Sequence, residues 1–239
     1  MLSIARSELI QILRNRAVLI TGLIMPMAAS AYFIYARDTF EGDGGLGYVG
    51  AVTVFTIAAF TLYSTAVTTL AARRQNLFLK RLRSTAASDP AILSGLVLPV
   101  TMISLLQVGF ILVAFAAVGD RPADVPLLAA AVGSAFVMML ALGLATAGVT
   151  NSPEQAQVTT LPLSLGTIAV ASWVGITGTE SLTWLKRLLP GGSATELVVD
   201  AWNGGVPLTD SLLLLAPTLS WVVVAIALAS RMFRWEPRQ

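Results

Sequence analysis

The chain has 239 residues, of which 56% are hydrophobic and only 12% are charged, and its formal net charge at pH 7 is +2. A water-soluble domain of this length does not need so much apolar surface, and apolar runs of about 20 residues without strand-like alternation predict an all-α integral membrane protein. The sequence contains no cysteine and no histidine, which excludes disulfides, thiol nucleophiles, histidine acid–base chemistry and most zinc or haem sites.

The N-terminal part predicts an interfacial helix and a first span. Residues 1–16 place apolar and polar side chains on opposite helical faces, so this helix is expected to lie in the membrane interface. The apolar run 17–36, interrupted by Pro26, predicts the first transmembrane helix. A signal peptide is the rival interpretation because residues 29–31 (ASA) resemble a cleavage site, but the run continues beyond them.

The second predicted span, residues 46–72, is rich in hydroxyl side chains. Thr61, Thr65 and Thr68 share one face of an ideal helix. In a bilayer such groups hold helices together or line a polar path. The first role is favoured, and a substrate path is the alternative.

A basic stretch, residues 73–89, separates the second span from the third. Read as one helix, it has an apolar face and a basic face, with Leu77 out of place, and Pro90 is expected to end it. It is interpreted as a cytoplasmic helix that serves either as an ordinary positive-inside connection or as a docking element for a soluble partner. Its cations are Arg73, Arg74, Lys80, Arg81 and Arg83.

Spans three to five follow at 90–118, 125–149 and 153–176. Gln107, near the middle of the third, must find a partner or line a cavity. Glu154 lies in the first turn of the fifth, where the helix dipole favours an acidic residue.

Residues 180–203 predict two short outer helices, because neither half is long enough to cross a bilayer. They are expected to be interfacial or re-entrant, with Trp184 and Trp202 as interface anchors. The sixth span is expected at 208–232.

Charge predicts the orientation. Six spans put both termini on one side, and a cytoplasmic assignment leaves few cations outside, at Arg37, Arg121, Lys186 and Arg187. The expected location is a bacterial inner membrane with both termini cytoplasmic. The positive charge lies beside the bilayer and therefore does not indicate nucleic-acid binding.

The sequence also contains no motif that could supply energy for transport. No charged residue lies in the centre of a predicted span, which argues against an ion-coupled carrier, and there is no P-loop motif. The chain is therefore expected not to be an enzyme, and any active transport would draw on another subunit.

Four short segments in this order resemble the membrane subunit of ABC-2 type transporters, the type V exporter group. They are residues 14–16 (RNR), 79–85 (LKRLRST), 152–157 (SPEQAQ) and 189–197 (LPGGSATEL).

The resemblance implies that 1–16 is a connecting helix and that 73–89 contains a coupling helix that meets an ATPase. Two permeases, either two copies or this chain with a sister, would work with an ATPase dimer that holds ATP and Mg²⁺, while this chain has no cofactor. The residues assigned to ATPase coupling are Arg73, Arg74, Phe78, Lys80, Arg81, Leu82, Arg83 and Glu154. Those assigned to a substrate path are Thr61, Thr65, Thr68 and Gln107.

The function implied is ATP-driven export of a hydrophobic drug, natural product or lipid, including multidrug efflux and antibiotic resistance. A polysaccharide or glycolipid permease of the same family is an alternative, which the 8% aromatic content makes less favourable. A membrane immunity or anchor protein without transport is another.

Overall fold

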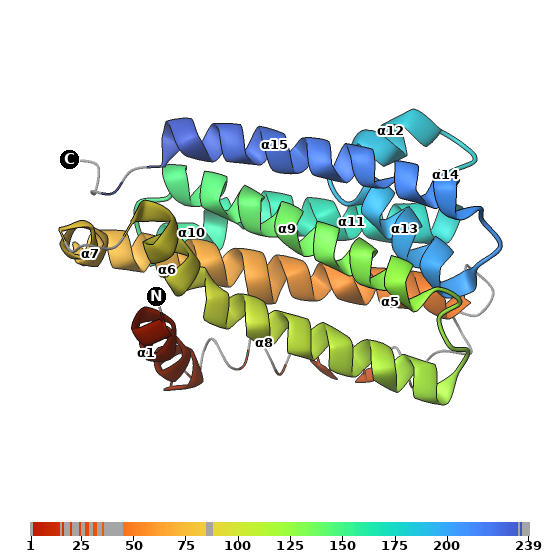
Figure 1. Ribbon diagram of the computed structural model, residues 1–239, viewed down its shortest axis with the longest axis horizontal. Helices are drawn as coiled ribbons and strands as arrows, with labels where there is room; N and C mark the ends of the chain where they lie inside the picture. Colours follow the sequence, from red (N-terminus) through yellow and green to blue (C-terminus); the bar gives the residue numbers. More distant parts are fainter. Residues whose placement is uncertain are drawn as a thin grey trace.

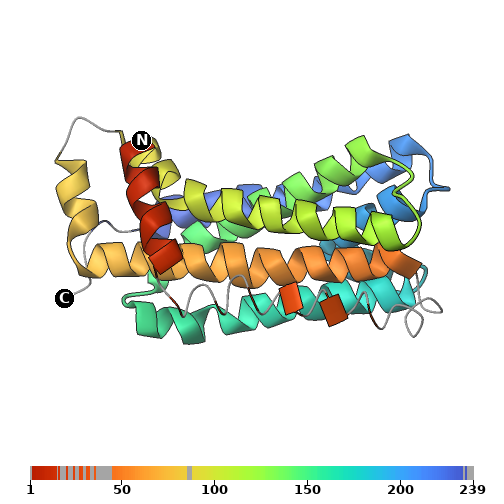
Figure 2. The same ribbon diagram turned by 90° about the horizontal axis from the view of Figure 1, so that it is seen from below.

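A computed structural model describes residues 2–14, 45–84, 88–233 and 235, together with isolated positions between 16 and 35. These residues are 86% helical and include no strand. The helices form one elongated bundle, with α1, α7 and the C-terminal end of α15 at one end and α12, α13 and α14 at the other (Figures 1 and 2). We call these the α7 end and the α12 end.

Five helical segments in the described part of the chain are long and apolar enough to cross a membrane. The predicted first span, 17–36, lies outside the described residues apart from isolated positions, so this span and the total of six stay predictions. The five segments are Gly45–Gln75, Asp89–Val118, Val125–Val149, Pro153–Thr177 and Leu208–Met232.

The first of these five segments is the most deeply buried and forms the centre of the bundle. It consists of α5 (Gly45–Ile57), a π-helical turn η3 (Ala58–Ser64) and α6 (Thr65–Gln75). Helix α8 (Asp89–Val118) packs against α1 (Leu2–Arg14) and α5. Helix α9 (Val125–Val149) begins at Asp124, whose side chain accepts a hydrogen bond from the Leu127 backbone N–H over 2.8 Å.

Three predicted helices are each interrupted. The basic stretch is not one helix, because α6 extends to Gln75 and a separate short helix, α7 (Phe78–Arg83), follows Leu77, whose φ is 56°. Asp89 and Pro90 begin α8 rather than ending the basic helix, since the first turn of a helix tolerates a residue without an N–H.

The other two interruptions lie at Thr160 and Leu214, each a few residues before a proline. The fifth segment divides into α10 (Pro153–Thr159) and α11 (Leu161–Thr177), and the last divides into α14 (Leu208–Leu213) and α15 (Leu215–Met232). Pro162 and Pro217 have no N–H to donate to the carbonyl four residues earlier, so the regular ladder is broken at these positions.

At the α12 end the chain folds into α12 (Thr183–Leu188) and α13 (Gly192–Asn203). Trp184 is 81% exposed, but Trp202 is only 3% exposed and packs beside Gly47 of α5. Trp202 is therefore a core residue rather than an interface anchor, because α13 lies between α5 and α9.

Candidate functional site

Helix α7 carries the exposed basic surface that the sequence predicts. Leu79 is fully buried, which fixes one face of this six-residue helix on the body of the bundle. Lys80, Arg81 and Arg83 are exposed, and Leu82 is half-buried between them. Helix α7 lies at the extreme end of the bundle (Figure 1), so these exposed cations are found there.

Arg73 connects three helices rather than extending this surface. Its guanidinium makes a two-pronged ion pair with Glu8 of α1, with both N–O distances 2.8 Å, and also donates to Gln11. It lies over the ring of Phe78 in α7, 5.3 Å from the ring centroid. Because both partners come from neighbouring helices, Arg73 and Phe78 position α7 relative to α1.

Arg74 points in the opposite direction, into the bundle. It is 1% exposed, and its guanidinium donates to the backbone carbonyls of Ala147 and Thr150 over 2.7 and 2.9 Å. These carbonyls belong to the C-terminal end of α9, where a cation is favoured. Arg74, which the resemblance assigned to ATPase coupling, is thus buried in the bundle and does not belong to the exposed basic surface of α7.

Leu77 is the residue that the helical pattern left out of place. It is 46% exposed and occupies the left-handed region, which costs a residue with a Cβ about 1–2 kcal/mol relative to a right-handed conformation. This turn directs α7 away from the axis of α6 and leaves an apolar side chain beside the basic surface.

Glu154 is exposed in the first turn of α10, which packs against α6. The segment around it is capped reciprocally. Ser152 Oγ accepts from the Gln155 N–H over 3.2 Å, and Gln155 Oε1 accepts from the Asn151 N–H over 2.8 Å. The cap fixes the start of α10 and holds Glu154 at the surface.

A second group of polar side chains lies inside the bundle around η3. Thr61 Oγ1 donates to Gln107 Oε1 of α8 over 3.3 Å, and both side chains are buried. The sequence named both residues as path candidates, and the structure brings them together.

The same π-helical turn contacts two more helices. Tyr63 OH and Thr146 Oγ1 of α9 lie 2.9 Å apart, and Ser64 Oγ and Ser164 Oγ of α11 lie 3.3 Å apart. We call Thr61, Gln107, Tyr63, Thr146, Ser64 and Ser164 the η3 cluster. π-Helical turns occur frequently at functional sites. The last four members of the cluster were not among the predicted path residues, because only tertiary packing brings Thr146 and Ser164 against Tyr63 and Ser64 of η3.

Thr65 and Thr68 do not belong to this cluster. Their hydroxyls donate to backbone carbonyls of their own helix, at Phe60 over 3.5 Å and Ser64 over 2.8 Å. The wider turn of η3 changes the angle per residue, so positions that share a face of an ideal α-helix no longer do so. Both side chains are half-buried.

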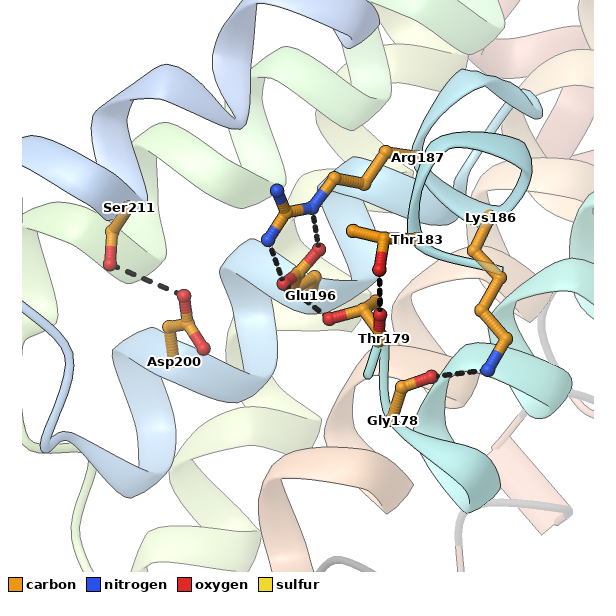
Figure 3. A network of polar contacts seen from close by, with 8 residues as sticks. All are labelled: Gly178, Thr179, Thr183, Lys186, Arg187, Glu196, Asp200 and Ser211. Carbon is orange, nitrogen blue, oxygen red and sulfur yellow. Dashed lines mark hydrogen bonds and ion pairs between the residues drawn. The ribbon is translucent and has the colours of Figure 1, made fainter. Parts of the chain in front are cut away.

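The α12 end holds a third polar network, drawn in Figure 3. Lys186 is fully buried, and its Nζ donates to Thr177 Oγ1 over 2.8 Å and to the Gly178 carbonyl over 2.6 Å. Nζ also lies 5.1 Å from the centroid of the Trp173 ring. Lys186 therefore fastens α12 to the C-terminal end of α11.

Arg187, the next residue, makes an ion pair within the same end. Its Nε and Nη2 donate to the two carboxylate oxygens of Glu196 over 2.8 and 2.7 Å (Figure 3). The hydrogen bonds with Glu196 raise the pKa of Arg187. Burial, and then the nearby negative charge of Glu196, raise the pKa of Asp200, which accepts a hydrogen bond from Ser211 over 3.2 Å.

Comparison with known proteins identifies a family over most of the chain. A family model described as ABC-2 family transporter protein matches residues 7–231. No curated protein matches. The family match covers the α7 surface, the η3 cluster and the network at the α12 end.

Proposed function

Since the chain belongs to the ABC-2 transporter family and is therefore a membrane transport component, we propose that it is the permease of an exporter driven by a separate ATPase. The observation that carries this proposal is α7, a short helix at the end of the bundle with its cations turned outward. An acidic surface on a soluble subunit would complement it. The sequence supplies no P-loop for hydrolysis in this chain.

The docking surface that we propose consists of Leu77, Lys80, Arg81 and Arg83. Arg73 and Phe78 hold α7 in place, because their contacts join α7 to α1 and α6. Force applied to α7 would therefore reach α1 through the ion pair with Glu8. The ATPase dimer would hold ATP and Mg²⁺.

The substrate class that we propose is a hydrophobic, uncharged molecule such as a drug, natural product or lipid. The segments 46–72, 90–118, 125–149 and 211–230 contain no charged residue, so they offer nothing to neutralise a charged cargo at depth. The hydroxyl and amide groups of the η3 cluster can exchange their mutual hydrogen bonds for bonds to the cargo when the helices separate. We infer that the path passes beside Thr61 and Gln107.

Docking is tested by co-expressing the tagged chain with an ABC ATPase from the same genome and measuring how much ATPase is retained on the permease. The double variant Arg81→Glu, Arg83→Glu should lose at least about tenfold in retention, because like charges then face the partner. Arg121→Glu, an exposed cation near the α12 end, is the matched control and should retain the partner. Retention that survives the double reversal contradicts the proposed surface.

The path is tested by comparing substrate range in cells that express the wild type, Thr61→Val or Thr68→Val. Thr61→Val removes the bond to Gln107 and should change the range of compounds exported, whereas Thr68→Val removes only a bond to its own helix and should not. Equal ranges in all three would contradict a path at the η3 cluster.

A further inference from the structure

Phe233 and Trp235, which follow α15 and which we call the tail, contact arginines of α6 and α7. The ring of Phe233 lies under the guanidinium of Arg74, 5.1 Å from its central carbon, and the ring of Trp235 lies at the same distance from Arg83 of α7. The two rings meet edge to face with centroids 5.4 Å apart. One aromatic pair therefore touches a buried arginine of α6 and an exposed arginine of α7.

The start of this tail is fixed by a close approach between helices. A Cβ at Gly148 of α9 would lie 2.9 Å from the carbonyl carbon of Met232, a distance too short for a side chain to occupy. Arg74, which Phe233 covers, is itself held by carbonyls at the end of α9. The tail thus leaves α15 from a defined position, with its first ring on a fixed cation.

Helix α7 needs such support. A helix of six residues is not stable by itself in water. Its other contacts include the buried Leu79, the packing of Phe78 and Leu82 against the core, and an ion pair between Arg83 and Asp89 at 3.3 Å with both side chains well exposed. Exposed ion pairs contribute little, so the aromatic contact is a substantial part of what holds the C-terminal half of α7.

We propose that Phe233 and Trp235 form a C-terminal clamp that positions α7 on the bundle. Phe233 anchors the clamp on Arg74, and Trp235 holds Arg83 and so restrains α7. The clamp joins the last span directly to the docking helix, so that movement of α15 and of α7 is coupled. Only this consequence for transport rests on the proposed function; the positioning of α7 does not.

The test uses the full chain in phosphatidylcholine nanodiscs without any ATPase and measures amide hydrogen exchange in residues 78–83. Trp235→Ala should accelerate exchange there about fivefold, because one cation–π contact and its apolar packing are lost. Trp184→Ala removes an exposed tryptophan at the α12 end and should leave exchange in α7 unchanged. Unchanged exchange in Trp235→Ala, or equal acceleration in both variants, overturns the clamp.

A double-mutant cycle separates the contact from a general loosening of the tail. If Trp235 acts through Arg83, adding Trp235→Ala to Arg83→Gln should accelerate exchange at residues 78–82 by less than about twofold over Arg83→Gln alone. A full additional effect in that background shows that Trp235 does not act through Arg83 and overturns the assignment. Because no partner is present, failure here leaves the ATPase-retention experiment intact as a separate test.

Discussion

Two short helices at opposite ends of the bundle share a sequence pattern and differ in what they bury. Residues 78–82 of α7 read FLKRL and residues 184–188 of α12 read WLKRL. Each helix follows a leucine in the left-handed region, Leu77 and Leu182, and these are the two non-glycine residues with positive φ among those described. The two local sequences are therefore similar, but Thr183 separates Leu182 from the pattern in α12, so the pattern begins one residue later in that helix.

Burial is reversed between them. In α7 the leucine of the pattern, Leu79, is fully buried and Lys80 is exposed, whereas in α12 Leu185 is 49% exposed and Lys186 is fully buried. The cause lies in what each helix meets. Helix α12 covers the end of α11, where oxygen atoms of Thr177 and the following loop accept hydrogen bonds, while α7 meets apolar side chains of the core. The comparison teaches that the neighbouring element decides whether this basic pattern fastens a structure or faces outward.

The largest effect should come from removing the lysine at each end. Lys186→Met removes the buried ammonium group that donates to Thr177 and to the Gly178 carbonyl, and it should lower the free energy of unfolding by about 1–3 kcal/mol because hydrogen bonds from a charged donor are lost. Lys80→Met, the same change at the matching position of α7, should alter it by less than about 0.5 kcal/mol because the side chain is exposed. Unfolding in detergent, followed by circular dichroism, compares the two. Equal losses would show that the ends do not differ as the structure indicates.

An intermediate effect is expected from the two left-handed leucines. Leu77→Gly and Leu182→Gly each relieve backbone strain, which offsets the flexibility that glycine adds to the unfolded chain, so stability should change by less than about 1 kcal/mol. Leu185→Gly, within the regular helix of α12, is the control and should destabilise by about 1 kcal/mol or more.

The same pair distinguishes the two ends by binding. Leu77→Gly should lower ATPase retention about tenfold, since an apolar contact of the docking surface is lost, while Leu182→Gly should leave it unchanged. If Leu77 has only a structural role, its substitution should change the free energy of unfolding and ATPase retention in parallel. That result at Leu77 would remove it from the docking surface.

The smallest effect concerns pH at the α12 end. Burial raises the pKa of Asp200 in the folded protein, so ionisation costs more in the folded state than in the unfolded state. Its contribution is favourable below the ordinary carboxyl pKa of about 4 and is lost as pH rises through the folded value. Asp200→Asn should therefore stabilise by a few tenths of a kcal/mol at pH 7, after allowance for solvent screening. The gain should vanish near pH 4, as melting temperatures across that range would show.

Several features could be predicted because they depend on composition and on residues close in the chain. Long uncharged segments determine where helices can cross a bilayer, and some prolines mark a break, as Pro162 does in the first turn of α11, although Pro99 lies inside the continuous α8. The order of short motifs indicated the ABC-2 transporter family, and the match of the family model to residues 7–231 confirms it. The exposed cations of α7 also follow from a local pattern, because a short amphipathic helix buries its apolar face.

The partners of individual side chains could not be predicted, because they depend on residues that are distant in the chain. Arg74 was assigned to the docking surface, but the end of α9 offers it carbonyls, and Trp202 was assigned to the interface, but α13 is inserted between α5 and α9. The π-helical turn shifts the threonines of the second span out of register, so that Thr61 meets Gln107 while Thr65 and Thr68 do not. Composition and periodicity report how one helix divides its own surface between apolar and polar, and they carry no information about which acceptor, ring or carbonyl a second helix places against it. That is why the sequence by itself determined five apolar segments and the basic stretch, and only the tertiary structure decided which cations of that stretch bind inside the bundle and which face outward.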